Sequence, residues 1–296
     1  MYDIIIIGAG PAGLTAALYA LRANKKVLIL EARSYGGQIV NAYKIENYPG
    51  IPEISGFDYA TTLYNQVKAL GADFKFETAL RIDEDKTVVT KSNTYNAKAI
   101  ILAIGSENRK LKIKDEEKYT GRGVSYCATC DGNFYKNKIV AVVGGGNTAL
   151  EDSVYLSNLV SKLYLIHRKD EFKGEEKYVE ELKEKDNIEF ISNSNVVKLN
   201  GTDKLTSIVV EDNDGNQKEL EVDGLFIAIG REPKNEIFSN IIDLDEYGYI
   251  KYTDDVHTNV NGIYVAGDAK VKNLRQLTTA VSDGAIAATT AIREME

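Results

Sequence analysis

The chain has 296 residues, of which 44% are hydrophobic and 27% are charged, and this composition is typical of a globular protein rather than a disordered or fibrous one. At roughly 150 residues per domain, the length predicts about two domains. Lysine and arginine total 36 against 44 acidic residues, and the net charge of −8 argues against nucleic acid or anionic membrane as a partner. Two cysteines in a chain of this length exclude a disulfide scaffold.

The N-terminal residues carry no export or membrane signal. The apolar run at residues 4–7 is short and ends in glycine, whereas a signal peptide needs a basic start and a longer apolar segment. No window approaches the ~18 uninterrupted apolar residues of a spanning helix. We therefore expect a cytoplasmic protein in a reducing compartment, where a Cys-x-x-Cys pair is more often catalytic or metal-binding than structural.

The first part of the chain predicts a strand, a glycine turn, a helix and a second strand. Residues 4–7 and 27–30 are unbroken apolar runs, as in strands of a parallel sheet. The turn between them carries Gly8, Gly10 and Gly13. In Gly-x-Gly-x-x-Gly the glycines allow a tight turn, approach of the backbone to a pyrophosphate, and close helix–strand packing. Glu31 would accept hydrogen bonds from a ribose 2′-hydroxyl, so the segment predicts an adenine dinucleotide site; the alternative is a glycine-rich junction without a ligand.

Cys127 and Cys130 form a lone Cys-x-x-Cys pair that is followed by Asp131. The compartment and the small loop disfavour a structural disulfide, and zinc would need two further ligands, since His167 and His257 lack finger-like spacing. The pair therefore favours a redox dithiol, in which one thiol is held as a thiolate and the other attacks a partner disulfide, and we expect no metal. Asp131 would exchange a proton with the outgoing thiolate or cap the following turn.

A second copy of the strand–turn–helix–strand pattern begins at residue 139. Gly144 and His167 are 23 residues apart, as are Gly8 and Glu31. In place of the acid stands a basic cluster of His167, Arg168, Lys169 and the nearby Lys173. Such a cluster would attract a 2′-phosphate and favours NADPH over NADH, the alternative being a solvated basic loop end. Two dinucleotide sites in one chain predict a tightly held FAD and an exchangeable nicotinamide.

The remaining segments give coarser predictions. Residues 169–185 are heavily charged and predict an exposed helix, and residues 208–222 predict a hairpin around Asp212 and Gly215. A calcium loop at this turn lacks its remaining ligands. Residues 278–292 are small and apolar and predict a buried C-terminal helix.

With two such units and a dithiol ahead of the second, the chain resembles the low-molecular-weight thioredoxin reductases over nearly its whole length. The matching segments are Gly8-x-Gly10-x-x-Gly13, Gly36-Gly37-Gln38, residues 46–50, residues 122–125, Cys127-Ala-Thr-Cys130-Asp131-Gly132, Gly144-x-Gly146-x-x-Ala149, His167-Arg168, residues 262–268 and Arg275-Gln276. The resemblance implies an α/β fold class with two Rossmann-like, three-layer ββα domains. It places an NADPH-binding domain at residues 113–235, inserted into an FAD-binding domain at residues 1–112 and 236–296.

The resemblance also implies roles for single residues. Cys130 would form the charge-transfer contact with the flavin, Cys127 would attack thioredoxin as the interchange thiol, and Asp131 would be the acid. Asp268 would hold the ribityl chain, and Arg275 and Gln276 would lie near the isoalloxazine. The FAD residues implied are Gly8, Gly10, Ala12, Gly13, Glu31, Gly37, Gln38, Asn47, Gly105, Asp268, Arg275 and Gln276. The NADPH residues implied are Gly144, Gly146, Asn147, Thr148, His167, Arg168, Lys169 and Lys173.

The family resemblance further implies a homodimer, thioredoxin as the partner, and rotation of the inserted domain about hinges near residues 110–116 and 232–240. Two departures bear on this expectation: Lys169 and Lys173 stand where the family usually has arginine, and Asn133 stands where it often has a phenylalanine that grips thioredoxin. The alternatives are a ferredoxin-dependent flavin thioredoxin reductase, a flavin dithiol oxidase of the same fold that passes electrons to oxygen, and a non-enzymatic redox-sensing flavoprotein. Arg168 and Lys169 favour the nicotinamide-dependent enzyme.

Overall fold

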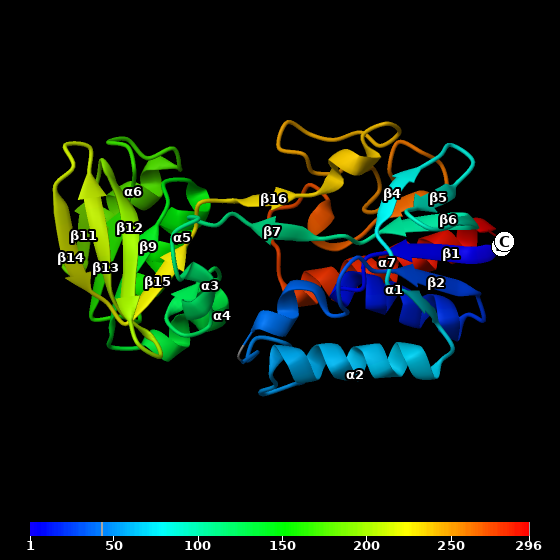
Figure 1. The fold of residues 1–296 in the computed structure, drawn as a ribbon, viewed down its shortest axis with the longest axis horizontal. Coiled ribbons are helices and arrows are strands. Elements are labelled where there is room, and N and C mark those ends of the chain that lie inside the picture. The colour runs from blue at the N-terminus through cyan, green and yellow to red at the C-terminus, as the bar shows by residue number, and fades with distance from the viewer. Residues whose placement is uncertain (43, 296) are drawn as a thin grey trace. The chain divides into compact units, whose positions relative to one another are not determined.

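The structure is a computed structural model that describes residues 1–42 and 44–295, and the chain divides into two compact units. Unit 1 comprises Met1–Glu107 and Glu232–Glu296, and unit 2 comprises Asn108–Arg231, so the expected insertion of one unit into the other is present. The unit boundaries lie a few residues before the expected ones at 112/113 and 235/236. The two connecting segments contain β7 (Ser106–Asn108) and β16 (Arg231–Pro233), which pair with each other (Figure 1).

A seven-stranded sheet is the centre of unit 1. Its parallel strands are β3 (Asp73–Lys75), β2 (Val27–Leu30), β1 (Tyr2–Ile7), β6 (Thr94–Leu102) and β17 (Ile263–Val265), in that order. The N-terminal end of β6 also pairs antiparallel with β5 (Thr87–Thr90), which pairs with β4 (Ala79–Ile82). The apolar runs of β1 and β2 are buried, as expected for strands that are covered on both faces.

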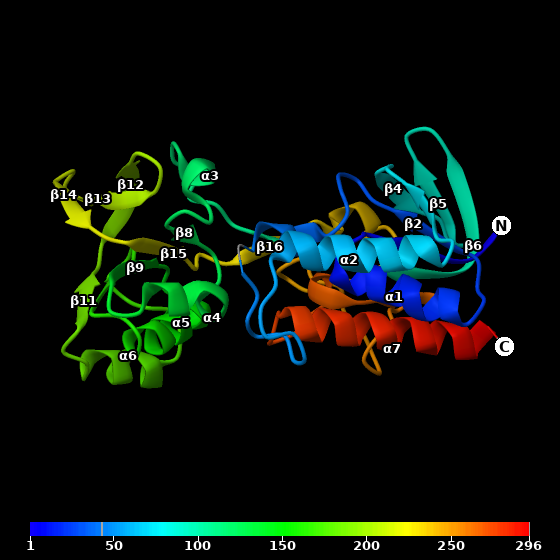
Figure 2. The same ribbon diagram turned by 90° about the horizontal axis from the view of Figure 1, so that it is seen from below.

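Helices cover one face of this sheet and β-structure covers the other. The helices α1 (Pro11–Arg22), α2 (Gly56–Ala69) and α7 (Leu277–Met295) lie side by side (Figure 2). Ile4 and Ile6 face these helices, whereas Ile5 and Ile7 face β4, β5 and the segment that includes η3 (Asn235–Phe238). Each fully buried isoleucine stabilises the fold by about 1.5–3 kcal/mol. The three-layer ββα arrangement and the C-terminal helix are confirmed, but this helix is buried only along the face that carries Asp283, Gly284, Ala287, Ala288 and Ala291.

Unit 2 has the same layers in a smaller form. Its parallel strands are β11 (Ile188–Ile191), β10 (Lys162–Ile166), β9 (Ile139–Val143), β15 (Gly224–Ile227) and β8 (Val124–Ser125), in that order. The helical elements are α3 (Glu116–Tyr119), α4 (Ala128–Asp131), η2 (Gly132–Tyr135), α5 (Asn147–Ser157) and α6 (Glu176–Lys183). An antiparallel sheet of β12 (Ser194–Gly201), β13 (Leu205–Asp212) and β14 (Gln217–Glu221) covers the other face. The hairpin prediction is confirmed by the pairing of β13 with β14.

The predicted helix over residues 169–185 is wrong in its first half, because only Glu176–Lys183 is helical. The backbone N–H groups of Lys173 and Gly174 donate to the carbonyl oxygen of Gly145, at 2.7 and 3.2 Å. Gly174 also has no room for a side chain, since a Cβ there would lie 2.5 Å from Leu150 Cδ1. These tertiary contacts keep residues 169–175 irregular and bring Lys173 to the second glycine turn. Within the described ranges, no helix combines the length and apolar character needed to cross a membrane.

Candidate active site

The expected FAD residues of unit 1 gather at one edge of its sheet. Gly8 follows β1, Glu31 follows β2, Gly105 lies shortly after β6, and Asp268 lies in η4 (Gly267–Ala269) after β17. These strands are parallel, so their carboxyl ends meet at the same edge. The strand order reverses between β1 and β6, and open α/β sheets bind ligands at such a point. The fold therefore positions this set of residues around one prospective site.

The glycine turn at this edge has glycines where the neighbouring backbone leaves little or no room for a side chain. Gly8 has a φ of +105°, and a Cβ there would lie 2.4 Å from the carbonyl oxygen of Ala103. A Cβ at Gly13 would lie 1.9 Å from the carbonyl oxygen of Gly8. Gly37, at the start of η1 (Gly37–Asn41), brings its backbone close to Gly10, since a Cβ at Gly37 would lie 3.2 Å from Gly10 Cα. This bare backbone at the N-terminus of α1 fits a dinucleotide pyrophosphate.

Glu31 ties the end of β2 to the glycine turn. Its Oε2 accepts a hydrogen bond from the Ala9 N–H at 2.8 Å, and its Oε1 accepts one from the Arg33 N–H at 2.9 Å. A carboxylate has about four lone-pair positions, so further positions are left for ribose hydroxyls. The ribose-binding role of Glu31 stays a prediction.

Three further FAD candidates, Asn47, Gln276 and Ala12, make contacts with segments far away in the sequence. The Asn47 amide donates to Gln276 Oε1 at 3.2 Å, across 229 positions of sequence. Ala12 on α1 lies against η4, because a Cβ at Gly267 would be 2.8 Å from Ala12 Cβ. Gln38 is exposed in η1. The prospective flavin site thus draws on the N-terminal third of the chain and on its C-terminal segment.

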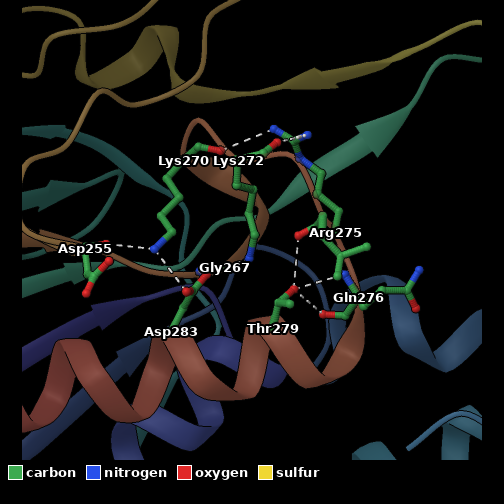
Figure 3. A network of polar contacts seen from close by, with 9 residues as sticks. Asp255, Gly267, Lys270, Lys272, Arg275, Gln276, Thr279 and Asp283 are labelled. Atoms are coloured by element: carbon green, nitrogen blue, oxygen red, sulfur yellow. Dashed lines mark hydrogen bonds and ion pairs between the residues drawn. The ribbon is translucent and has the colours of Figure 1, made fainter. Parts of the chain in front are cut away.

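A buried carboxylate that the sequence analysis missed holds the loop after β17 (Figure 3). Asp283 of α7 accepts a hydrogen bond from the Gly267 N–H at 3.0 Å and pairs with Lys270 Nζ at 3.0 Å and Lys272 Nζ at 2.7 Å. The guanidinium of Arg275 donates to the carbonyl oxygens of Lys272 and Lys270. The loop that carries Asp268 and Arg275 is therefore fixed to α7. In the sequence, the only sign of this role is that Asp283 is an acid within an otherwise small and apolar helical segment.

The second glycine turn follows β9 in unit 2. Gly144 has a φ of +154°, and a Cβ there would lie 2.3 Å from the carbonyl oxygen of Ala228. Gly146 is the residue before α5, and Asn147 and Thr148 form the exposed first turn of that helix. The exposed helix N-terminus beside bare backbone fits a second pyrophosphate. Asn147 also fixes the basic loop, since its Oδ1 accepts from the Glu175 N–H at 2.7 Å.

The basic cluster of unit 2 divides into a packed ring and three exposed cations. His167 is 8% exposed; its ring lies over Gly145 and stacks on Phe172 at a centroid distance of 5.1 Å. Burial lowers the pKa of His167, and the neighbouring cations lower it further, so its imidazole is neutral at pH 7. The charge that would attract a 2′-phosphate therefore comes from the exposed side chains of Arg168, Lys169 and Lys173.

The cysteine pair lies at the same edge of the same sheet as this second turn. Cys127 follows β8 and immediately precedes α4, and it is joined to Cys130 by a disulfide with a Cα–Cα distance of 5.3 Å. Ser125 at the end of β8 donates a hydrogen bond from Oγ to Asp131 Oδ2 at 2.6 Å and accepts one from the Cys127 N–H at 3.1 Å. Burial raises the pKa of Asp131, and the Ser125 hydrogen bond opposes this rise.

The described residues contain no group of three or more His, Cys, Asp or Glu side chains placed to hold a metal ion. The arrangement instead offers a disulfide, an acid beside it, and backbone cradles for two nucleotides. These groups are the components that electron transfer between a nucleotide cofactor and a disulfide requires.

Comparison with known proteins gives matches over the full length. A sequence model of the family described as pyridine nucleotide-disulphide oxidoreductase matches residues 2–284. A thioredoxin reductase of Listeria innocua serovar 6a is 41% identical over 100% of this chain and 94% of its own length. A 34.2 kDa protein in the rubredoxin operon of Clostridium pasteurianum is 40% identical over 97% of this chain and 94% of its own. The crystal structure of thioredoxin reductase from Streptococcus pyogenes MGAS5005 is 38% identical, with a TM-score of 0.95 and coverage of 100% of this chain and 98% of that one.

Proposed function

This chain belongs to the pyridine nucleotide-disulphide oxidoreductase family, and we propose that it is a thioredoxin-disulfide reductase that uses NADPH and FAD. The observation that carries the proposal is the Cys127–Cys130 disulfide at the sheet edge that also bears the second nucleotide cradle. Thioredoxin as the substrate is supported by the relatives from Listeria innocua and Streptococcus pyogenes, both of which are thioredoxin reductases.

The two cradles divide the cofactors between the units. The glycine turn of unit 1 and Glu31 would hold FAD, and the glycine turn of unit 2 with Arg168 and Lys169 would hold NADPH. FAD held in the first cradle would supply two-electron chemistry, because a flavin can accept a hydride from NADPH and pass an electron pair on to a disulfide. The side-chain-free backbone at Gly8 and Gly13 supports this assignment, because a Cβ at either position would meet a carbonyl oxygen within 2.4 Å.

The cysteine pair carries the chemistry on the protein itself. Once the disulfide is reduced to two thiols, the Cys127 thiolate attacks the thioredoxin disulfide, which forms a mixed disulfide and releases one thioredoxin thiolate. The Cys130 thiolate then attacks Cys127 Sγ, restores the protein disulfide and releases the second thiolate. The two protons of the dithiol end on the two thioredoxin thiols. Asp131 takes the proton from Cys127 and gives it to the first outgoing thiolate, a step that its raised pKa favours.

The assignment of Cys127 as the attacking thiol follows the family pattern, as do a homodimeric state and a cytoplasmic location. The oligomeric state is tested by light scattering on the FAD-loaded protein. A mass of one chain would contradict the dimer and leave the reductase chemistry to be judged separately.

Anaerobic titration of the FAD-loaded protein tests the function. We expect NADPH to bleach the flavin absorbance, and oxidised thioredoxin then to restore it. Bleaching by neither nicotinamide would overturn the proposal, and bleaching by NADH alone would overturn the choice of coenzyme. The Cys127→Ser variant should keep flavin reduction and lose thioredoxin turnover. Restoration that requires oxygen rather than thioredoxin would indicate a dithiol oxidase.

A further inference from the structure

The hydroxyl of Ser125 connects the acid of the site to the attacking cysteine. Ser125 is 4% exposed at the end of β8. Its Oγ lies 2.6 Å from Asp131 Oδ2, 3.1 Å from the Cys127 nitrogen and 3.4 Å from the Cys127 carbonyl oxygen. All three contacts are to the segment that carries the disulfide, so the hydroxyl bridges the acid and the backbone of the cysteine.

These contacts suit both protonation states of Asp131. When the carboxyl is ionised, Ser125 donates its proton to Oδ2 and accepts from the Cys127 N–H. When the carboxyl is protonated, it can donate to Oγ, and the serine proton is free to turn toward the Cys127 carbonyl oxygen. A hydroxyl has one donor and two acceptor positions, so the Asp131 carboxyl and the Cys127 N–H each keep a hydrogen bond to Ser125 in either state.

A buried polar group that loses its hydrogen bond during a reaction pays a desolvation penalty, which slows the step. Asp131 is partly buried, and it must give up and regain a proton in each cycle of the proposed function. We propose that Ser125 is a positioning residue for thiol–disulfide exchange, which keeps the Asp131 carboxyl tied to Cys127 throughout the proton exchange. The inference rests on the proposed function and deepens it, because it assigns a role within the same site.

Elements packed around this segment carry other titratable groups, and the same pH measurement has to account for them. Tyr135 of η2 is near Asp131, and burial, Asp131 and Asp223 raise the pKa of Tyr135 to about 12, so it stays neutral. The helix α5 packs against the segment after Asp131, since a Cβ at Gly132 would lie 2.9 Å from the Tyr155 ring. This helix carries Glu151 and Asp152, and burial raises the pKa of Asp152 to about 7, with a smaller contribution from Glu151. The Asp152→Asn background removes this titration from the comparison.

The test measures NADPH-dependent thioredoxin reduction against pH for Ser125→Ala, Asp131→Asn and the double variant, each in the wild-type and Asp152→Asn backgrounds. The part of the profile that Asp131→Asn removes is the part that Asp131 controls. We expect Ser125→Ala to lower turnover about tenfold. This loss is smaller than the ~10²–10⁴-fold that a general acid contributes, because the acid itself remains. In this variant the ionised Asp131 carboxylate loses a hydrogen bond, which raises the pKa of Asp131. We therefore expect the Asp131-controlled part of the pH–rate profile to move to higher pH. The double variant should be no slower than Asp131→Asn alone.

Controls separate this role from a structural one. Anaerobic flavin reduction by NADPH should be unchanged in Ser125→Ala, and its loss in every protein, wild type included, would instead refute the proposed function. Ser125→Thr keeps the hydroxyl, so its Asp131-controlled part of the pH–rate profile should match that of the wild type. This variant keeps the proposal testable if Ser125→Ala does not fold. Ser157→Ala removes another buried hydroxyl of unit 2, which donates to the Val154 carbonyl oxygen, and should leave the profile unmoved. Each of three results would overturn the proposal. The Asp131-controlled part of the pH–rate profile could stay unmoved in Ser125→Ala, or it could shift in Ser125→Thr. In the double variant, the loss of turnover could equal the product of the two single losses.

Discussion

Replacing Asp283 by asparagine tests how the prospective flavin loop is held. Asp283 is the shared partner of Lys270 and Lys272, and the exposed fractions of the three side chains are 12%, 6% and 10%. Removing one member of a buried ion pair typically costs about 3–5 kcal/mol, because the remaining charges stay desolvated. The asparagine can keep a hydrogen bond to the Gly267 N–H, so the cost arises mainly from the two lysines. We expect the free energy of unfolding of unit 1 to fall by about 3–5 kcal/mol.

Urea unfolding of the FAD-loaded protein, followed by flavin release and circular dichroism, measures this change. A matched control is Asp3→Asn, since Asp3 also accepts from a backbone N–H, that of Lys26 at 2.9 Å, and pairs with Lys98 Nζ at 2.7 Å. Lys98 is 54% exposed, so this pair is worth less than about 1 kcal/mol. Equal and small losses for Asp283→Asn and Asp3→Asn would refute the reasoning that burial makes the Asp283 cluster decisive.

Three further changes test other parts of the site. Gly13→Ala should yield protein with little FAD per chain, because its Cβ would meet the Gly8 carbonyl oxygen at 1.9 Å; normal flavin absorbance would contradict the cradle. Arg168→Ala should raise the KM for NADPH about tenfold, or about 1.4 kcal/mol, and should leave the KM for NADH unchanged. Lys185→Ala serves as the control and should change neither KM. Equal rises in both KM values would refute 2′-phosphate recognition. The pKa of His167 is lower in the folded protein than in the unfolded chain, so below about pH 6.5 the unfolded chain binds a proton that the folded protein does not. The free energy of unfolding therefore decreases as the pH is lowered below about 6.5. His167→Gln should lose less stability over this window in urea titrations, and identical slopes would count against a buried neutral ring.

The layers and both glycine turns could be predicted from sequence because their signals are local. Buried parallel strands need unbroken apolar runs, and residues 4–7, 27–30 and 139–143 provide them. Gly8, Gly13 and Gly144 stand where a Cβ would lie within 2.4 Å of a backbone carbonyl oxygen, so these glycines of the motif are required by the close approach of the backbone.

The parts that could not be predicted depend on contacts between distant segments. Asp283 meets Lys270 and Lys272 only because α7 packs beside the loop after β17. The charged run at residues 169–175 has helical composition, yet Gly145 binds its backbone in another conformation. The sequence places His167 in a basic cluster, but it does not show that the ring is buried against Gly145 and Phe172 and therefore neutral. That burial depends on the tertiary structure.

The most direct test of the account is the electron balance of the complete reaction without oxygen. The FAD-loaded protein, a limited amount of NADPH and an excess of oxidised thioredoxin are mixed anaerobically, and NADPH oxidation and new thioredoxin thiols are both counted. We expect two thioredoxin thiols for each NADPH oxidised, and none when Cys127 or Cys130 is replaced by serine. NADPH oxidation without new thiols, or thiols formed by the serine variants, would contradict the route through the Cys127/Cys130 pair.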